Sequence, residues 1–350
     1  MKNRAVLIIA IFLLPTYALA DIKKSDWEKL NQQVIILYHQ AKYTQSLTLA
    51  RNALQLARET FGPDHPNTAV SLNNLGLICK TLAMYDQAES SYNHAVAIWE
   101  KTAEPNNPAI VSPLNNLAEL AKIRAKYDEA ELLYKRILKI KQKCFGAQDP
   151  NVVISLNNLA GVYVAKYEYD KAEPLYEKAL AISQNSSPTD YAAIVQIFNN
   201  LAALHQKKGN LEQAILLYTQ AIDISRQKLG PQHCITAQLL NNMATAYQAR
   251  NKLPQAKDLC LQSLSIRENT FGAEHPQTAQ SLNNLGSIEL AEQQYDKAME
   301  HFARALAINE KIFGPTHPET KTTLANISKC HSQNTNRKQN EQMKKQLQEF

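Results

Sequence analysis

Apolar residues recur along this chain at helical spacing, in two consecutive stretches separated by a short break. From Thr68 to about Thr81, with one more apolar residue just beyond, the stripe comprises Leu72, Leu75, Ile78, Cys79 and Leu82. This spacing is typical of one face of an amphipathic helix. A second stripe follows over residues 88–98, and a loop with two prolines then leads to the next stripe. The pattern predicts a helical hairpin.

The hairpin is repeated along the chain, because the sequence Leu-Asn-Asn-Leu in its first helix returns every 42 residues. The copies begin at Leu72, Leu114, Leu156, Phe198, Leu240 and Leu282, with altered copies at Leu30 and Leu324. A constant period without insertions is typical of a stack of equal repeats, each packed on its neighbours. The sequence therefore predicts an all-α solenoid, a right-handed superhelix of about eight helical hairpins, with repeats starting near residues 26, 68, 110, 152, 194, 236, 278 and 320.

Small residues occupy one fixed position in each predicted helix. The first helices carry Gly76, Ala118, Ala160, Ala202, Ala244 and Gly286, and the second helices carry Ala88, Ala130, Ala172, Ala214, Ala256 and Ala298. Small side chains allow two helix backbones to approach closely. We expect these columns, and the tyrosines at Tyr92, Tyr134, Tyr176 and Tyr218, to form the core.

The repeat resembles the tetratricopeptide repeat through Asn74-Leu75-Gly76, Tyr85, Ala88, Tyr92 and Ala95. Its longer unit has a recurring connector of the form Phe-Gly-x-x-His-Pro, as in residues 61–66, 271–276 and 313–318, and a variant at 145–150. A 42-residue unit with this connector is similar to the kinesin-light-chain type, here over about residues 25–328. The connectors at 101–108 and 184–190 lack Phe-Gly, and we interpret them as local weak points or hinges.

The two ends of the chain depart from the repeat. Residues 1–20 combine a basic start, an apolar run from Ala5 to Leu14 and the small residues Ala18-Leu19-Ala20, which is typical of a secretory signal. An uncleaved anchor is the alternative. The expected mature solenoid covers 21–328, and 329–350 is a polar cap or tail with a second helix near 336–349. We expect a bacterial protein that is exported to the periplasm or secreted.

Charge and cysteine content narrow the possible functions. The formal net charge is +6, and removal of residues 1–20 would lower it by two, which argues against a nucleic-acid binder. Five cysteines leave at least one unpaired thiol in an exported chain. Cys79 and Cys260 stand at apolar positions of the repeat, so we expect them to be buried as small hydrophobic side chains. The sequence assigns no disulfide.

No catalytic or metal-binding motif is present in the sequence. The connector histidines His65, His233, His275 and His317 share one register, but a metal site needs ligands that converge on one point. We expect each histidine to order its own connector by hydrogen bonding. The sequence predicts no enzyme activity, no cofactor and no metal site.

The asparagines of the repeat are the candidate binding residues. A helical wheel places both amides of each pair away from the seam between the two helices of a hairpin. The resemblance implies that such asparagines line a concave groove and hold the backbone of an extended peptide, since an amide both donates and accepts hydrogen bonds. The predicted peptide-binding residues are Asn73, Asn74, Asn115, Asn116, Asn157, Asn158, Asn199, Asn200, Asn241, Asn242, Asn283 and Asn284, together with Lys80, Lys122 and Lys207. The alternative is structural: one asparagine of each pair bonds the neighbouring repeat's backbone and braces the stack.

The sequence thus favours a non-catalytic scaffold that binds a peptide segment or partner protein in the groove. The lysines near the first repeats would favour an acidic or carboxylate-bearing segment. Two alternatives stay open: a structural scaffold of an envelope assembly that uses convex or edge surfaces, and a non-catalytic subunit of an enzyme complex. We expect no nucleic-acid partner and no membrane span after removal of residues 1–20.

Overall fold

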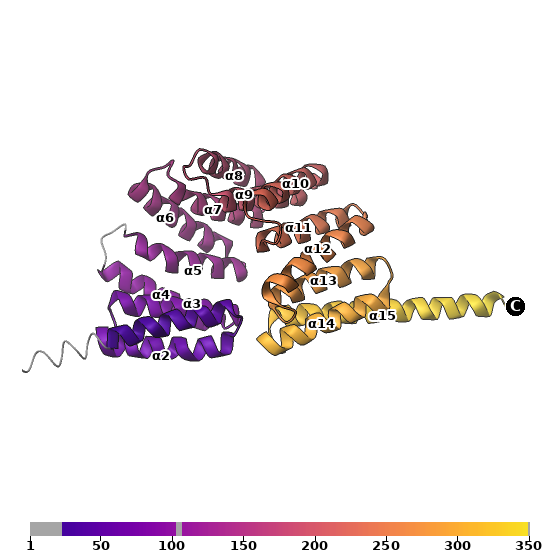
Figure 1. Ribbon diagram of the computed structural model, residues 1–350, viewed down its shortest axis with the longest axis horizontal. Helices are drawn as coiled ribbons and strands as arrows, with labels where there is room; N and C mark the ends of the chain where they lie inside the picture. The colour runs from indigo at the N-terminus through magenta and orange to yellow at the C-terminus, as the bar shows by residue number, and fades with distance from the viewer. Residues whose placement is uncertain (1–22, 103–106, 349–350) are drawn as a thin grey trace, which may run out of the picture. The chain divides into compact units, whose positions relative to one another are not determined.

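The computed structural model describes residues 23–102 and 107–348, and every regular element in these ranges is a helix (Figure 1). The predicted signal segment and the centre of the 101–108 connector lie outside the described residues. The chain divides into two compact blocks, 1–144 and 145–350. We call them the N-terminal and C-terminal blocks and describe each by itself.

The N-terminal block contains three helical pairs. Residues 23–39 form a helix that precedes α2 (Tyr43–Phe61). The next pair is α3 (Pro66–Thr81) with α4 (Tyr85–Thr102). The third pair is α5 (Val111–Ile123) with α6 (Tyr127–Phe145), and α6 ends at the block boundary. The short 3₁₀ helix η1 (Pro108–Ile110) precedes α5. The first helix predicted from Thr68 to about Thr81 is confirmed, two residues longer at its start.

The C-terminal block continues the same succession. After η2 (Pro150–Val152), its pairs are α7 (Val153–Ala165) with α8 (Tyr169–Gln184), α9 (Tyr191–Lys207) with α10 (Leu211–Lys228), α11 (Cys234–Ala249) with α12 (Leu253–Phe271), and α13 (Pro276–Ala291) with α14 (Tyr295–Phe313). A single helix, α15 (Pro318–Gln348), ends the chain. The all-α solenoid of repeated hairpins is confirmed.

The two helices of a hairpin are joined by a tight turn through a residue with positive φ. In the α3–α4 turn, Met84 N–H donates to the Cys79 carbonyl at 2.8 Å and Ala83 N–H donates to the Lys80 carbonyl at 3.1 Å, as in a Schellman motif. The positive-φ residues of the described turns are Ala41, Ala83, Ala125, Tyr167, Gly209, Asn251 and Gln293. Only one of these is glycine, so the turn conformation is imposed by the helices that pack on either side of it.

The seam inside each hairpin is built on the predicted small residues. Ala88 and Ala298 are fully buried, as are the aromatic rings of Tyr92 and Phe302. A Cβ on Gly76 would stand 2.5 Å from the Tyr92 ring, and one on Gly286 would stand 2.8 Å from the Phe302 ring. Glycine at these two positions therefore gives the facing ring its place in the core.

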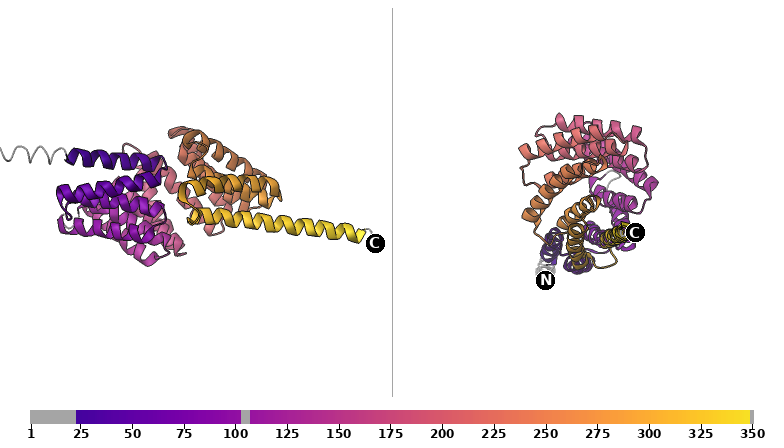
Figure 2. Two further views of the ribbon diagram at one scale, coloured as in Figure 1. Left: turned by 90° about the horizontal axis from the view of Figure 1, so that it is seen from below. Right: turned by 90° about the vertical axis from the view of Figure 1, so that its right-hand side faces the viewer.

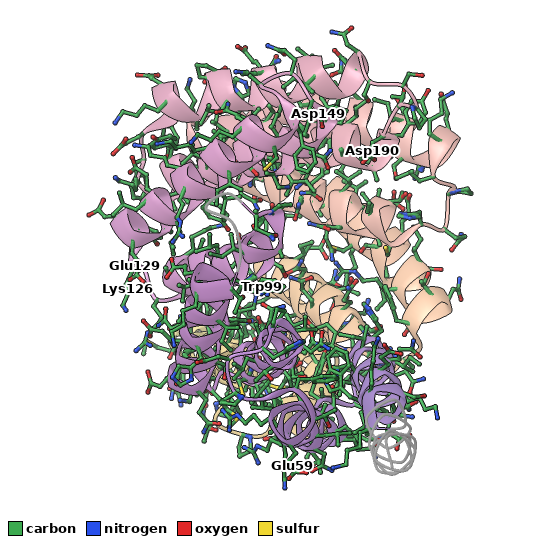
Figure 3. All side chains as sticks on the ribbon, turned by 90° about the vertical axis from the view of Figure 1, so that its left-hand side faces the viewer. Glu59, Trp99, Lys126, Glu129, Asp149 and Asp190 are labelled. Atoms are coloured by element: carbon green, nitrogen blue, oxygen red, sulfur yellow. The ribbon has the colours of Figure 1, made fainter. Side chains whose placement is uncertain are left out.

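Ion pairs connect successive repeats at the surface of the helices. In the N-terminal block, Glu89 on α4 pairs with Arg124 at 2.6 Å and with Lys126 at 3.2 Å, and Glu129 lies 3.6 Å from Lys126 (Figure 3). In the C-terminal block, Glu173 pairs with Lys208 at 3.0 Å in the same register, and at a later contact the charges are reversed, since Lys257 pairs with Glu289 and Glu292, each at 3.1 Å.

The last repeat corrects one sequence-based expectation. The second helix predicted near 336–349 does not fold back, because α15 continues as one helix of 31 residues (Figure 2). The register of the turn falls at Thr335, whose hydroxyl instead bonds the His331 carbonyl within the helix. Beyond Cys330 the helix has few apolar residues, so a second helix would have no apolar face to bury against the first.

Candidate functional site

The twelve predicted asparagines lie on the first helices α3, α5, α7, α9, α11 and α13. We call them the asparagine column. Asn199, Asn241 and Asn283 are buried, and the other nine are half-buried. The structure therefore separates the pairs of α9, α11 and α13 into an inner first asparagine and a more accessible second one, whereas Asn157 and Asn158 of α7 are both half-buried.

Amide-to-amide hydrogen bonds connect consecutive first helices within each block. The second asparagine of a pair donates from Nδ2 to the side-chain Oδ1 of the asparagine 43 positions earlier. In the N-terminal block the bonds are Asn74 to Asn31 at 2.9 Å and Asn116 to Asn73 at 2.9 Å. In the C-terminal block they are Asn200 to Asn157 at 2.9 Å and Asn242 to Asn199 at 2.8 Å.

These bonds bear on the structural alternative, which expected a bond to the neighbouring repeat's backbone. The neighbouring repeat is the partner, but the bonds join side chain to side chain. A primary amide has two N–H donors and an oxygen with two lone pairs, so one bond leaves a donor and an acceptor on Asn74, Asn116 and Asn242. The oxygen of Asn200 accepts from both Gln196 and Asn199, each at 3.2 Å. Asn115 and Asn158 also have polar partners.

The first asparagine also reaches forward to a hydroxyl group in some repeats. Asn241 donates to the Ser281 hydroxyl at 2.9 Å, and Asn283 donates to the Thr323 hydroxyl at 2.8 Å. In the N-terminal block, Asn73 makes a longer bond of 3.3 Å to Ser112. The Oδ1 atoms of Asn241 and Asn283 are buried without a hydrogen-bond partner among the described residues.

The predicted lysines do not form one basic surface. Lys80 and Lys122 lie near Glu119, whose carboxylate accepts from Lys122 at 3.2 Å and from the Tyr134 hydroxyl. Burial lowers the pKa of Lys80, Glu119 opposes this shift, and Lys122 adds to it. Lys207 is exposed at the end of α9 in the other block. The Lys80–Glu119–Lys122 cluster thus combines two bases with one acid.

The connector histidines have the local role that the sequence predicted. In each of these connectors the imidazole Nδ1 accepts the backbone N–H two residues on, at 3.1 Å for His65 and 3.2 Å for His233, His275 and His317. These bonds cap α3, α11, α13 and α15. Within residues 23–102 and 107–348, no group of His, Cys, Asp or Glu has the arrangement of a metal site.

The family model described as tetratricopeptide repeat matches residues 28–101, 79–143, 109–185, 191–269, 235–311 and 280–339. The chain belongs to the tetratricopeptide repeat family. The resemblance stated from the sequence is thereby confirmed, and repeats of this family generally mediate protein–protein interaction. No curated protein sequence matches the chain.

Several solved structures are similar to this tetratricopeptide repeat protein. The apo form of RapI is 13% identical, with a TM-score of 0.58 over 82% of this chain and 98% of that one. The signal transduction ATPase with a tetratricopeptide repeat sensor from Pyrococcus horikoshii is 15% identical, with a TM-score of 0.54 over 87% of this chain and 45% of that one. BtubC (BKLC) from P. vanneervenii is 21% identical, with a TM-score of 0.48 over 63% of this chain and 82% of that one. These likenesses concern the fold alone.

Sequence reasoning missed two buried polar networks of the tetratricopeptide repeats. Arg267 on α12 is 2% exposed and donates to the Gln277 carbonyl at 2.7 Å and to the Ser281 hydroxyl at 3.1 Å. Burial lowers its pKa to about 10, and its Nε atom has no partner among the described residues. Glu289, also buried, pairs with Lys257 and with His301, the latter at 2.7 Å. A comparison by register could have found both, since neighbouring repeats have Ser225 and Asn309 in place of Arg267, and Tyr247 in place of Glu289.

Proposed function

We propose that this protein is a non-catalytic scaffold that holds a peptide segment of a partner protein along the asparagine column. The observation that supports the proposal is that Asn74, Asn116 and Asn242 are each held by one amide-to-amide bond and yet are only half-buried. A side chain already fixed by one bond loses little conformational freedom when it binds a ligand. Each of these amides keeps a donor and an acceptor that match a peptide bond.

The binding role therefore belongs to the second asparagine of each pair more than to the first. Asn199, Asn241 and Asn283 are buried, so their share in the proposal is to position the accessible amides rather than to contact the segment. In the N-terminal block, Lys80 and Lys122 outnumber Glu119, which favours a segment with an acidic residue at that place. No catalytic step is part of the proposal, and the absence of enzyme activity stays a prediction.

Selection from a random peptide library, followed by fluorescence anisotropy with the best-binding peptide, tests this proposal on the full chain. The test variant changes Asn116, Asn200 and Asn242 together to alanine. We expect at least a tenfold loss of affinity. The matched control changes three exposed amides of second helices, Gln87, Gln213 and Gln255, to alanine, with no expected change. Equal affinity of both variants, with unchanged circular dichroism, would exclude the asparagine column as the binding face.

The edge-binding alternative has one supporting observation in each block. Leu132 on α6 and Leu216 on α10 share one register of the second helix and are 70% and 51% exposed. Single exposed leucines are ordinary on protein surfaces, so they carry less weight than a column of amides. If Leu216→Ser, and not the asparagine variant, weakens the selected peptide, the second helices are the binding surface.

Export is a separate proposal that rests on the sequence of residues 1–20. None of the described helices has the length and apolar character needed to cross a membrane. We propose cleavage before Asp21 during export to the periplasm or beyond. The mass of the intact protein purified from a bacterial host's periplasm checks this proposal, and a mass that includes Met1 to Ala20 would contradict it.

A further inference from the structure

The connector that precedes α9 differs from the regular connectors in its aromatic side chains. In three regular connectors a phenylalanine stacks on the capping histidine, with ring centroids 5.1 Å apart for Phe61–His65, 4.6 Å for Phe271–His275 and 4.3 Å for Phe313–His317. At the same register the connector before α9 has Ser187 and Tyr191. It therefore lacks the aromatic stack, and its helix is capped by Asp190, which accepts the Ala193 N–H at 3.0 Å.

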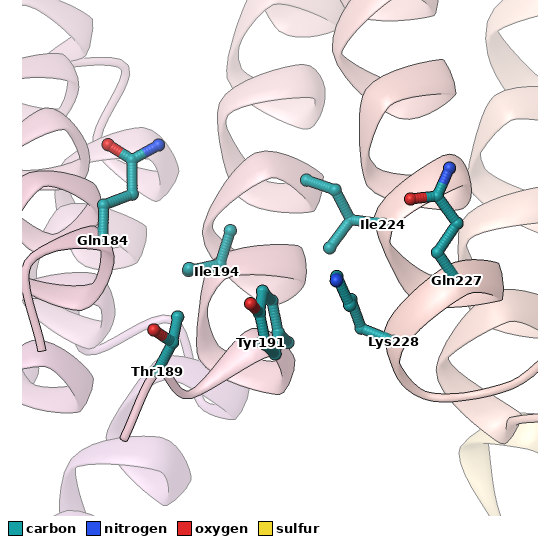
Figure 4. A pocket seen from close by; sticks show the side chains of 7 residues that line it. All are labelled: Gln184, Thr189, Tyr191, Ile194, Ile224, Gln227 and Lys228. Carbon is teal, nitrogen blue, oxygen red and sulfur yellow. The ribbon is translucent and has the colours of Figure 1, made fainter. Parts of the chain in front are cut away.

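A pocket of about 300 Å³ lies beside this connector, between α9 and the last turns of α10 (Figure 4). Its apolar wall is formed by Ile194, which is 5% exposed, and Ile224. The ring of Tyr191 and the ammonium group of Lys228 stand at one side, and Gln184 stands at the other. The volume is at the lower end of the range for small-molecule sites, about 300–1,000 Å³.

A pocket at the equivalent place two repeats later provides a comparison for the charge of the pocket beside α9. That pocket, of about 280 Å³, lies beside the connector before α13 and is lined by Glu274 of this connector and by Arg304, Ile308 and Lys311 of α14. Its two bases are neutralised, because Lys311 pairs with Glu274 at 2.6 Å and Arg304 pairs with Glu268 at 2.5 Å. Internal carboxylates therefore occupy the place that an external anion would take.

Within the part of the chain that the structure describes, no such ion pair joins the residues that line the pocket beside α9. Glutamines stand at the registers of Glu268, Arg304 and Lys311, namely Gln184, Gln220 and Gln227, and Asp190, at the register of Glu274, caps α9 by accepting the Ala193 N–H. The ammonium of Lys228 lies 5.2 Å from the centroid of the Tyr191 ring and has no carboxylate partner among the described residues. A cation–π contact positions the ammonium but leaves its charge uncompensated.

From this difference we propose that the pocket is a binding site for a small carboxylic acid with an apolar body. The apolar body would pack on Ile194 and Ile224, the carboxylate would pair with Lys228, and the side-chain amide of Gln184 or Gln227 would donate a hydrogen bond to its second oxygen. An amine is excluded by the positive charge of Lys228. The site is separate from the asparagine column and does not depend on the function proposed for it.

Saturation-transfer NMR on the full chain tests the site with 3-phenylpropionate as the probe and 3-phenylpropanamide as its uncharged counterpart. We expect the acid to bind and the amide to bind at least tenfold more weakly. Lys228→Gln should weaken binding of the acid by at least tenfold. Gln184→Glu should do the same, since it supplies at the same register the internal carboxylate that Glu268 provides in the other pocket.

The matched control is Lys311→Gln in the ion-paired pocket, which should leave binding of 3-phenylpropionate unchanged. The asparagine variant of the previous subsection should also bind the probe normally, so a failure of one proposal is distinguishable from a failure of the other. Absence of binding to the unmodified protein, equal binding of acid and amide, or an equal loss in the Lys228 and Lys311 variants would each overturn the proposal.

Discussion

The contact between α9 and α11 and the contact between α11 and α13 use the same pair of asparagines in different ways. At the first contact, buried Asn199 accepts a hydrogen bond from Asn242 of the next repeat at 2.8 Å. At the second, buried Asn241 donates to Ser281 at 2.9 Å, and its own Oδ1 has no partner among the described residues. The residues are equivalent in sequence, yet one amide bonds an amide and the other bonds a hydroxyl.

The residue 40 positions after each first asparagine accounts for the difference. After Asn241 this residue is Ser281, which is fully buried and offers a hydroxyl. After Asn199 it is Leu239, which is fully buried and offers nothing to bond. At these two contacts the amide bonds the hydroxyl where the neighbouring repeat buries one there, and serves as acceptor for the next repeat's amide where it buries a leucine. The comparison shows that the hydrogen-bond partner of a repeated asparagine depends on the side chains of the adjacent repeat.

The largest effect is expected when the apolar neighbour is exchanged. Leu239→Ser removes a fully buried side chain and should destabilise the protein by about 3–4 kcal/mol in urea denaturation. It also gives Asn199 the hydroxyl that Asn241 has. Leu239→Ala is the control, because it opens the same cavity without a hydroxyl. If the coupling energy between Asn199 and Asn242 is as large in the Leu239→Ser protein as in the Leu239→Ala protein, the residue at position 239 does not decide which group Asn199 bonds.

Removal of the hydroxyl from the second contact should have the next largest effect. Ser281 accepts from Asn241 and from Arg267, so Ser281→Ala leaves two buried donors with fewer partners. We expect a loss of about 2–3 kcal/mol in the free energy of unfolding. Ser287→Ala on the same helix removes only a bond to the Asn283 carbonyl within α13 and should cost about 0.5 kcal/mol or less. Similar losses for both serines would mean that the buried network contributes little.

Double-mutant cycles should distinguish the two contacts directly. Alanine substitutions at Asn199 and Asn242 are expected to show a coupling energy of about 1 kcal/mol, the usual net value of one hydrogen bond. The same cycle for Asn241 and Asn284, the equivalent pair at the second contact, should show coupling near zero, because Asn241 Oδ1 accepts no bond. Equal couplings would show that the amides bridge both contacts.

The smallest perturbation is a labelling experiment on Cys260 of α12. Burial raises the pKa of this thiol to about 12, so at pH 8 almost none of it is thiolate, the reactive form. We expect DTNB to leave Cys260 unmodified in the native protein and to modify it in urea. Ser281→Ala should speed its modification, since Cys260 packs in the same core cluster as Leu282 and Leu285 of α13. Rapid modification of Cys260 in the unaltered protein would contradict its burial.

Much of the local structure could be read from the sequence. The apolar stripes predicted the hairpins, the small-residue columns predicted the close seam at Gly76 and Gly286, and the histidines were expected to order their connectors. Cys79 and Cys260 are buried as predicted, and none of the five cysteines is in a disulfide. The prediction of a second helix near 336–349 in the last repeat was wrong, because helical periodicity does not tell whether a segment has an apolar face that can pack on the preceding helix.

The candidate site was predictable only as a set of positions. The sequence placed the asparagines away from the seam of the hairpin, but it did not show which of them would be buried or that their partners would be side chains. Those partners stand 39 to 43 residues away along the chain. The sequence showed that the connector before α9 lacks Phe-Gly, but this predicted a weak point or hinge and not a pocket.

By itself, the sequence determined the period, the helices and the seam of each hairpin, because those depend on residues close together in the chain and on side-chain size. The tertiary structure alone decided the bonds of the asparagines and left Arg267 and Lys228 without a carboxylate partner among the described residues. Each of these depends on which side chain the next repeat presents across the contact. A repeating sequence places such groups at a fixed register, but hydrogen bonds and ion pairs need a partner at about 3 Å. The neighbouring repeat has a suitable partner at some contacts and not at others.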